Sequence, residues 1–301
     1  MSDEGGEFRE IAIVGLGLIG SSIARAVRAA DAGVRLVAVD HSAAAAEAAC
    51  GAGVVDAVAA DVATAAATAD LVILAVPVRA LPCELQALLP LAAGLAARGT
   101  LVTDVGSTKA SLLAAAASLF GAAPAWLVPG HPLAGSERSG WAAGKADLFA
   151  GRKVLLCPTA ANAAALARVA AFWRRLGAKV EAMDADEHDG LLAQTSHLPH
   201  LLSFALVEAL IDATPAARLF GHSGGGFRDM TRLAASDPVM WRDIALDNRD
   251  GVLRAIDLFA SRLADLRADV AAGDGVALQR RFDRAKAARD AHLPPSEGNP
   301  S

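Results

Sequence analysis

The chain has 301 residues, a length that favours two domains, because a domain typically has roughly 150 residues. The formal net charge is −5, so no basic face is expected for general binding to nucleic acid. Hydrophobic residues make up 54% of the chain, yet no run reaches about 18 uninterrupted apolar residues. The first ten residues are polar and acidic, so a secretory leader is not expected. We therefore expect a cytoplasmic protein that does not enter a membrane.

Short β-rich runs alternate with alanine-rich segments up to about residue 183. Several of the runs are continuously apolar, which is typical of strands covered on both faces, and segments such as 21–31 and 111–120 suit crossover helices. Repeated strand–helix units predict a Rossmann-type, doubly wound, mostly parallel sheet over residues 1–183. The expected strands are 11–17, 34–40, 69–77, 99–106, 125–130, 152–158 and 178–183.

No β-rich run follows residue 184. The segment 184–212 indicates one long helix or a broken pair, opened by acidic residues that suit a helix N-terminus. Apolar residues recur at helical spacing over 237–273, and a last helix is expected over 275–291. The sequence thus predicts an α/β domain followed by an all-helical domain over residues 184–292, then a disordered tail at 293–301. So much apolar helical face favours a homodimer.

The hexapeptide GLGLIG follows the first expected strand and opens the first expected helix. In this setting the spacing G-x-G-x-x-G is the fingerprint of a dinucleotide-binding loop, whose helix N-terminus offers N–H groups to the phosphates. Its glycines allow a tight turn, close approach of the pyrophosphate, and close packing of helix on strand. The expected cofactor-binding residues are Gly15, Gly17, Leu18, Ile19, Gly20 and Asp40.

Asp40 ends the second expected strand and indicates which dinucleotide binds. A carboxylate at this point accepts hydrogen bonds from the ribose 2′-hydroxyl and repels a 2′-phosphate. The next residues, His41 and Ser42, include no arginine to accommodate that phosphate. We therefore expect NAD, the alternative being a glycine-rich turn that binds no nucleotide.

Four polar motifs follow in order: DVGSTK at 104–109, GHPLAGSE at 130–137, SHLPH at 196–200 and HSGGGFRDMTRLA at 222–234. Together they resemble the prephenate/arogenate dehydrogenase family, over roughly residues 10–290. The resemblance implies a homodimer that uses NAD(P). It further implies oxidative decarboxylation of a small anionic substrate, either prephenate to 4-hydroxyphenylpyruvate or arogenate to tyrosine. Neither the chorismate mutase nor the ACT domain found fused in some family members is expected.

His131 stands between Gly130 and Pro132, directly after an expected strand. By the resemblance, it is the base that takes the proton of the substrate hydroxyl as hydride leaves. Ser107 would hydrogen-bond the same hydroxyl or orient the nicotinamide. A rigid turn is expected to hold the imidazole, with a pKa near the ordinary value of about 6.5. The alternative is a histidine that only caps the strand end or satisfies backbone carbonyls.

The expected substrate-binding residues lie in the helical half. By the resemblance, Ser196 and His200 hold the substrate and His197 is structural. Arg232 suits the ring carboxylate, because a guanidinium binds carboxylates through two parallel hydrogen bonds, and Asp229 is expected to pair with it when substrate is absent. His197 and His200 are three positions apart and also suit a metal ion, but no third ligand accompanies them, so no metal is expected.

Two other functions fit parts of the pattern. A β-hydroxyacid dehydrogenase has the same two-part build, but it relies on a catalytic lysine in a glycine-rich helical motif, and Lys109 lies in a different context. A non-catalytic NAD-sensing protein tolerates the loss of His131, Ser107 and Arg232, yet all three are present. The choice between prephenate and arogenate stays open, because no position identifies a partner for the ammonium group of arogenate.

Overall fold

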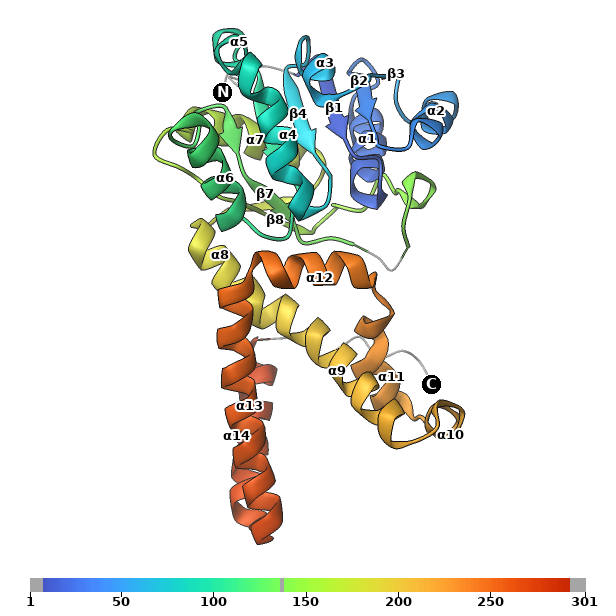
Figure 1. The fold of residues 1–301 in the computed structure, drawn as a ribbon, viewed down its shortest axis with the longest axis vertical. Helices are drawn as coiled ribbons and strands as arrows, with labels where there is room; N and C mark the ends of the chain where they lie inside the picture. The colour runs from blue at the N-terminus through green and yellow to red at the C-terminus, as the bar shows by residue number, and fades with distance from the viewer. Residues whose placement is uncertain (1–7, 136–137, 293–301) are drawn as a thin grey trace. The chain divides into compact units, whose positions relative to one another are not determined.

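Six parallel strands form the main sheet, in the order β3-β2-β1-β4-β5-β6 (Figure 1). This computed structural model describes residues 8–135 and 138–292. The order steps outward from β1 in both directions, as in a doubly wound sheet, so the predicted fold class is confirmed. The strands are β1 (Glu10–Val14), β2 (Arg35–Val39), β3 (Ala57–Val58), β4 (Leu71–Leu74), β5 (Leu101–Asp104), β6 (Leu127–Val128), β7 (Gly130–Pro132), β8 (Lys153–Leu156) and β9 (Lys179–Ala182).

Helices cover both faces of the main sheet. The chain winds in one direction from β1 to β3 and in the other direction from β4 to β6. Right-handed crossovers therefore place α1 and α2 on one face of the sheet, while α4 and α6 pack together on the other. The expected crossover helices at 21–31 and 111–120 correspond to α1 and α6. The helices of the first half are α1 (Leu18–Ala30), α2 (Ala43–Gly51), α3 (Val62–Ala66), α4 (Leu81–Leu88), α5 (Ala92–Arg98), α6 (Ala110–Phe120) and α7 (Ala163–Arg175).

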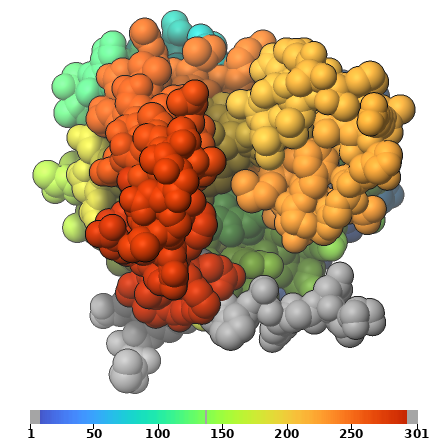
Figure 2. Space-filling view, turned by 90° about the horizontal axis from the view of Figure 1, so that it is seen from below, coloured from blue at the N-terminus to red at the C-terminus, as the bar shows by residue number. Residues whose placement is uncertain are grey.

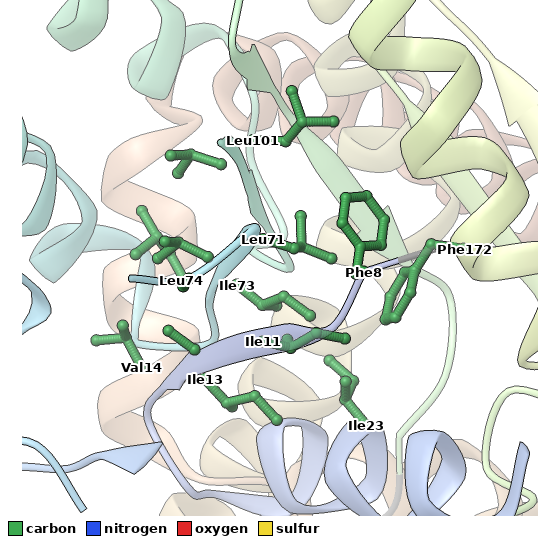
Figure 3. Close-up of a cluster of buried hydrophobic side chains, with 14 of the residues drawn as sticks. Phe8, Ile11, Ile13, Val14, Ile23, Leu71, Ile73, Leu74, Leu101 and Phe172 are labelled. Carbon is green, nitrogen blue, oxygen red and sulfur yellow. The ribbon is translucent and has the colours of Figure 1, made fainter. Parts of the chain in front are cut away.

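The core lies between these helices and the central strands (Figure 3). All four residues of β4 are buried, as its continuous apolar run predicts, and all four of β5 are buried although it ends in Thr103 and Asp104. Ile13 of β1, Ile73 of β4 and Ile23 of α1 are fully buried in one cluster. Truncating such an isoleucine to alanine typically costs about 2–5 kcal/mol, so this core sets a rigid base for the loops at the strand ends.

A second sheet of three strands departs from the prediction. The expected strand 125–130 is only Leu127–Val128 in the main sheet, and β7, β8 and β9 pair separately, with β7 antiparallel to β8. Pro129 stands between β6 and β7. Because proline has no N–H to donate, it interrupts the ladder and lets the chain change partners.

The helical half begins with one helical path that contains a π turn. Helix α8 (Ala185–Leu192) runs through the π-helical segment Ala193–His197 into α9 (Leu198–Ala213). Pro199 lacks the N–H that the carbonyl of Thr195 needs in an α-helix, and a wider π turn just before a proline accommodates this loss. The expected single helix or broken pair over 184–212 is therefore one helical path with a local widening.

Shorter helices follow α9 along the chain. Helices α9 to α11 pack together and form the yellow and orange mass in Figure 2. The packing of the chain divides between Gly251 and Val252, so α8 to α12 share a compact unit with the sheet. The remaining helical elements are α10 (Ala216–Gly221), α11 (Gly225–Thr231), the 3-10 turn Arg232–Ala235, α12 (Pro238–Asp247), α13 (Arg249–Ala272) and α14 (Gly275–His292).

Helices α13 and α14 are joined by a short turn and by ion pairs. Arg281 of α14 pairs with Asp269 and Asp265 of α13. The expected helix over 275–291 is thus α14, and the predicted tail 293–301 lies outside the described residues.

One segment, Val78–Arg98, meets the length and hydropathy of a membrane-spanning helix, with a mean hydropathy of 1.4. It consists of a 3-10 turn on Val78–Ala80, then α4, a second 3-10 turn on Leu89–Leu91, and α5. Leu81, Leu85, Leu88 and Leu95 are buried in the main core. A single segment of this kind is weak support for a membrane span.

Candidate active site

The turn between β1 and α1 accepts only glycine at two positions. Gly15 has a φ of +96°, in the left-handed region, and a Cβ there would lie 2.4 Å from the carbonyl oxygen of Ala75. A Cβ on Gly20 would lie 1.9 Å from the carbonyl oxygen of Gly15. The absence of a side chain at Gly20 therefore lets α1 pack directly against the end of β1.

The N-terminus of α1 is open toward the loop. Among the described residues, no atom outside Gly17 and its two chain neighbours lies within 4 Å of the position that a Cβ on Gly17 would take. In the described part of the chain no side chain caps this end of the helix. The first N–H groups of an α-helix, here including those of Leu18 and Ile19, have no intrahelical partner and suit a phosphate group.

Asp40 lies at the end of β2, beside the same loop. Its Oδ2 accepts the backbone N–H of Leu16 at 2.7 Å, and its Oδ1 accepts that of Ser42 at 2.9 Å. Each carboxylate oxygen keeps further capacity to accept a hydrogen bond from a ribose hydroxyl. An uncapped helix, open space at Gly17 and a fixed carboxylate together fit a dinucleotide, while the individual roles stay predictions.

His131 lies in the middle of β7, so the predicted turn is wrong. It pairs in register with Leu155 of β8, and the residue is only 9% exposed. The strand forms because the antiparallel partner supplies a ladder for the chain after Pro129. Of the motif 130–137, residues 136–137 lie outside the described residues.

A buried ion pair fixes the backbone next to His131. Lys109 and Asp104 are both fully buried and paired with each other. The Lys109 ammonium also donates to the Gly130 carbonyl at 2.7 Å, and the Gly130 N–H donates to Asp104 Oδ1 at 3.0 Å. Burying two charges is costly unless both are paired and hydrogen-bonded, as they are here. Lys109 thus has no free amine for a substrate, which a β-hydroxyacid dehydrogenase mechanism would need.

Two histidines and an aspartate form a buried chain of hydrogen bonds. His131 Nδ1 lies 2.9 Å from His188 Nε2, and His188 Nδ1 lies 2.7 Å from Asp189 Oδ1. His131 comes from β7 and the other two come from α8, and His188 is completely buried. A strand and a helix that are far apart in the sequence thus meet at one imidazole.

The order of donors in this chain follows from the carboxylate. An ionised aspartate only accepts hydrogen bonds, so His188 carries its proton on Nδ1. A neutral His188 then offers the lone pair of Nε2 and accepts from His131 Nδ1–H. His131 Nε2 is left with a lone pair and no proton, which is the form that a general base needs.

Burial and nearby positive charge keep His131 neutral. Burial lowers the pKa of His131 well below its ordinary value of 6.5, and charge on His188, Lys109 and His197 acts in the same direction. The expectation that the pKa of His131 stays near 6.5 is therefore wrong, because this pKa is lowered. Burial raises the pKa of Asp189, but hydrogen bonds from His188, Ala110 and Lys109 outweigh it and lower that pKa overall.

Asp189 also anchors the loop that carries Ser107. Its Oδ1 accepts the N–H of Lys109 at 2.8 Å and its Oδ2 accepts that of Ala110 at 2.9 Å, at the start of α6. The half-buried Ser107 lies two positions before Lys109. Among the described residues the Ser107 hydroxyl makes no hydrogen bond, to His131 or to any other group. The structure thus brings the loop to the relay without a direct contact between the two predicted catalytic side chains.

His200 is held by its own helix and by an aromatic ring. Its Nδ1–H donates to the carbonyl of Ser196 at 2.9 Å, and its ring stacks on Trp241 with centroids 3.6 Å apart. Trp241 packs in a small cluster with Val78. Burial lowers the pKa of His200, and the Ser196 carbonyl opposes this, while the charge of Arg232 lowers it further. Arg232 is thus an electrostatic neighbour of His200.

Arg232 and Asp229 are both exposed, on either side of the junction between α11 and the 3-10 turn Arg232–Ala235. The predicted pairing of these two residues is wrong, because no ion pair joins them within residues 8–135 and 138–292. The change from α-helical to 3-10 winding between them alters the spacing that an i, i+3 pair needs, and exposed pairs gain little. The Ser196 hydroxyl also has no hydrogen-bond partner in the described chain.

His197 serves the packing of the site. Asn248 Nδ2 lies 3.2 Å from His197 Nδ1 and donates to the Asp189 carbonyl at 2.7 Å. His197 Nε2 is buried without a partner among the described residues. Burial lowers the pKa of His197 to about 4, against the pull of Asp189. Nor does any group of three or more metal-ligating side chains occur in the described residues.

Sequence reasoning missed the residues that hold His131. Asp104 and Lys109 were visible only as parts of the DVGSTK motif, and His188 and Asp189 only as members of an acidic helix start. The adjacent pair His188–Asp189 is a usable signal, because a histidine beside a carboxylate at a helix start suits an oriented imidazole.

Two family models match the chain in sequence order. The model described as "Prephenate dehydrogenase, nucleotide-binding domain" matches residues 23–182. The model described as "Prephenate dehydrogenase, dimerization domain" matches residues 184–284.

Full-length relatives extend this likeness. The chain is 38% identical to a cyclohexadienyl dehydrogenase of Zymomonas mobilis, over 94% of this chain and 95% of that protein. It is 36% identical to a prephenate dehydrogenase of Bacillus subtilis, over 93% of this chain and 75% of that protein. Among solved structures, it is similar to a prephenate dehydrogenase from A. aeolicus in complex with hydroxyphenyl propionate and NAD+. That match has a TM-score of 0.86 at 33% identity, and covers 95% of this chain and 98% of the other.

Proposed function

The chain belongs to the prephenate dehydrogenase family, and on this premise we propose that it converts prephenate to 4-hydroxyphenylpyruvate by oxidative decarboxylation. Its cofactor is NAD. The observation that carries the proposal is His131, a buried and neutral imidazole whose Nδ1 is engaged by His188 at 2.9 Å. A base with this protonation is what the hydroxyl group of such a substrate requires.

The chemistry assigns a task to each side of the substrate. Ring carbon C4 carries a hydroxyl and a hydrogen, and bound NAD+ supplies the acceptor for that hydrogen as hydride. His131 Nε2 takes the hydroxyl proton, which turns C4–OH toward a carbonyl. The bond from the ring to its carboxylate then breaks, CO2 leaves, and the electron pair enters the ring and makes it aromatic. The oxygen of the new phenol takes a proton back from His131, so the protein neither gains nor loses a proton over the reaction.

Substrate binding is assigned to the helical half. Arg232 is exposed and makes no ion pair in the described part of the chain, so its guanidinium is available for the ring carboxylate. His200, stacked on Trp241, and Ser196 would line the same region. Ser107 would orient the substrate hydroxyl or the nicotinamide from the loop anchored by Asp189.

A second substrate is favoured by one finding. The relative named cyclohexadienyl dehydrogenase matches nearly the whole chain, and both prephenate and arogenate are cyclohexadienyl compounds. Arogenate has an ammonium group where prephenate has a keto group, and its ring chemistry is the same. The base and the cofactor loop therefore serve either compound, and the difference lies in side-chain recognition.

The test is a direct assay. The purified protein is mixed with NAD and either prephenate or arogenate, the rise in NADH absorbance is followed, and the products are identified. We expect 4-hydroxyphenylpyruvate from prephenate, with kcat/KM for the two substrates giving the specificity. Absence of NADH formation with both substrates would overturn the proposal.

We also propose that the chain is a homodimer. The matched model for residues 184–284 is described as a dimerization domain. Within this range, five apolar side chains of α13 and α14 are each more than half exposed: Leu258, Leu263, Val270, Val276 and Phe282. Sedimentation analysis should give twice the chain mass. The change Phe282→Asp should weaken the dimer, whereas Ala287→Asp, which adds the same charge on another side of α14, should not.

A further inference from the structure

Holding the His131 ring in one orientation requires only a hydrogen-bond acceptor, whereas His188 is also able to take up a proton. A backbone carbonyl would hold the His131 ring equally well, because it accepts from Nδ1–H and fixes the tautomer. The chain instead places a second imidazole there, completely buried, with Asp189 on its far side at 2.7 Å. His188 Nε2 carries a lone pair, so it can accept a proton as well as a hydrogen bond.

We propose that His188 is the temporary store for the proton that His131 takes from the substrate. As His131 Nε2 receives the hydroxyl proton, the proton on His131 Nδ1 moves across the 2.9 Å contact to His188 Nε2. His131 is then neutral again, with its proton on Nε2, and His188 is an imidazolium beside the Asp189 carboxylate. This inference rests on the proposed function of the site.

The charges around the relay favour this location for the cation. His131 lies near the ammonium of Lys109, which is itself paired with Asp104. His197 is an electrostatic neighbour of both imidazoles, so it does not favour either one. His188 faces the Asp189 carboxylate, which the N–H groups of Lys109 and Ala110 hold in place. In a buried site, positive charge beside a paired carboxylate is far less costly than positive charge beside a lysine.

The proton balance closes over one turnover. The hydroxyl proton enters at His131 Nε2, and an equivalent proton leaves Nδ1 for His188. When decarboxylation places the electron pair in the ring, the oxygen of the new phenolate recovers the proton from His131 Nε2, and His188 returns its proton to Nδ1. No proton is gained or lost by the protein, so the store needs no exchange with solvent during the reaction.

A purely orienting histidine and a proton store differ in the number of protons that move together. The rate of the wild-type enzyme is measured in mixtures of H2O and D2O, with substrate deuterated at C4 used to establish conditions in which hydride transfer limits the rate. If the hydroxyl proton and the His131 Nδ1 proton move in the same step, the rate is a curved function of the deuterium fraction of the solvent. A straight line for the wild type would overturn the proposal without any variant.

The variant His188→Gln sharpens the test. Glutamine accepts a hydrogen bond from His131 Nδ1–H through its carbonyl, but it does not take up a proton. We expect kcat to fall about 10- to 100-fold, a part of the about 10²–10⁴-fold that a positioned base contributes, with unchanged KM and NAD affinity. The remaining rate should depend linearly on the deuterium fraction. The matched control His292→Gln, at the end of α14, should behave as wild type.

The outcomes separate the two proposals. If the wild type forms no NADH with prephenate or arogenate, the proposed function fails. If the wild type turns over and His188→Gln keeps the same kcat and a curved dependence, the store fails while the function stands.

Discussion

The predicted base, His131, and the predicted partner of the substrate carboxylate, Arg232, are held in opposite ways. His131 is buried, its strand is tied to Asp104 and Lys109, and its ring is engaged by His188. Arg232 is exposed and forms no ion pair within the described residues. The fold therefore sets the protonation of the base through its own hydrogen bonds. It leaves the guanidinium in water, where a substrate carboxylate competes only with hydration.

This contrast predicts two kinds of variant. Changes at the buried relay should lower kcat or stability, because they remove an arrangement that the fold maintains. A change at the exposed Arg232 should raise KM with little effect on stability, because it removes only an interaction with the substrate.

The largest effect is expected for His131→Asn. Asparagine has similar bulk but takes no proton at neutral pH, so kcat should fall by about 10²–10⁴-fold while folding and NAD affinity stay unchanged. Steady-state assays against the matched control His292→Asn measure this. If the variant keeps nearly full kcat, the proton goes elsewhere, and His200 is the next residue to test.

The pH dependence of the wild type and of His131→Asn tests the assignment of His131 as the base. Protonation of His131 at low pH removes the base, and its lowered pKa delays this loss, so wild-type kcat/KM should hold to a pH clearly below 6.5. The residual activity of His131→Asn should lack this acid limb. An acid limb that persists unchanged in the variant would assign it to another group.

A second large effect is expected on stability. Lys109→Met leaves the buried Asp104 carboxylate without its partner, which should cost about 3–5 kcal/mol in the free energy of unfolding, measured in urea. Adding Asp104→Asn in the same chain should recover part of the loss, because it removes the unpaired charge. A loss below about 1 kcal/mol would mean that the pair does not support the strand of His131 as argued.

An intermediate effect is expected for Arg232→Ala. Loss of a charge-assisted hydrogen bond costs about 1.5–3 kcal/mol, so kcat/KM for prephenate should fall about 10- to 100-fold through KM. Arg228→Ala, an exposed arginine on the neighbouring turn, is the matched control and should leave KM unchanged. An unchanged KM in Arg232→Ala would remove this residue from the substrate site.

The smallest effect is expected for Asp40→Ser. Serine relieves the repulsion of a 2′-phosphate, so the preference for NAD over NADP should narrow by roughly tenfold. The control is Glu47→Ser, which replaces an exposed acidic residue and should leave the preference unchanged. The ratio of kcat/KM values for the two cofactors measures it. A wild-type enzyme that uses NADP as well as NAD would show that Asp40 does not select the cofactor.

The sequence predicts the fold better where contacts are local. Apolar runs identified β1, β2 and β4, because strands covered on both faces are rich in apolar residues. The split after Pro129 was not predicted, because a three-residue strand such as β7 depends on a distant partner rather than on its own composition. The same dependence explains why His131 was expected in a turn.

The site follows the same rule. The glycine loop and Asp40 were recognisable because the residues and their spacing are local. His188 lies 57 positions from His131, and only the topology brings α8 against β7. In sequence, Asp189 is one more acidic residue at the start of a helix, while in the structure it holds both the relay and the start of α6.

The central claim is that the fold itself gives His131 a protonated Nδ1 and an unprotonated Nε2. Nitrogen NMR of the protein with labelled histidine, among seven histidines in the chain, measures this state directly once His131→Asn has assigned the signals. At neutral pH we predict that His131 is neutral, with its proton on Nδ1 and a hydrogen-bonded, unprotonated Nε2 on His188. A protonated Nε2 on His131, or a positively charged His131 ring, would contradict the account.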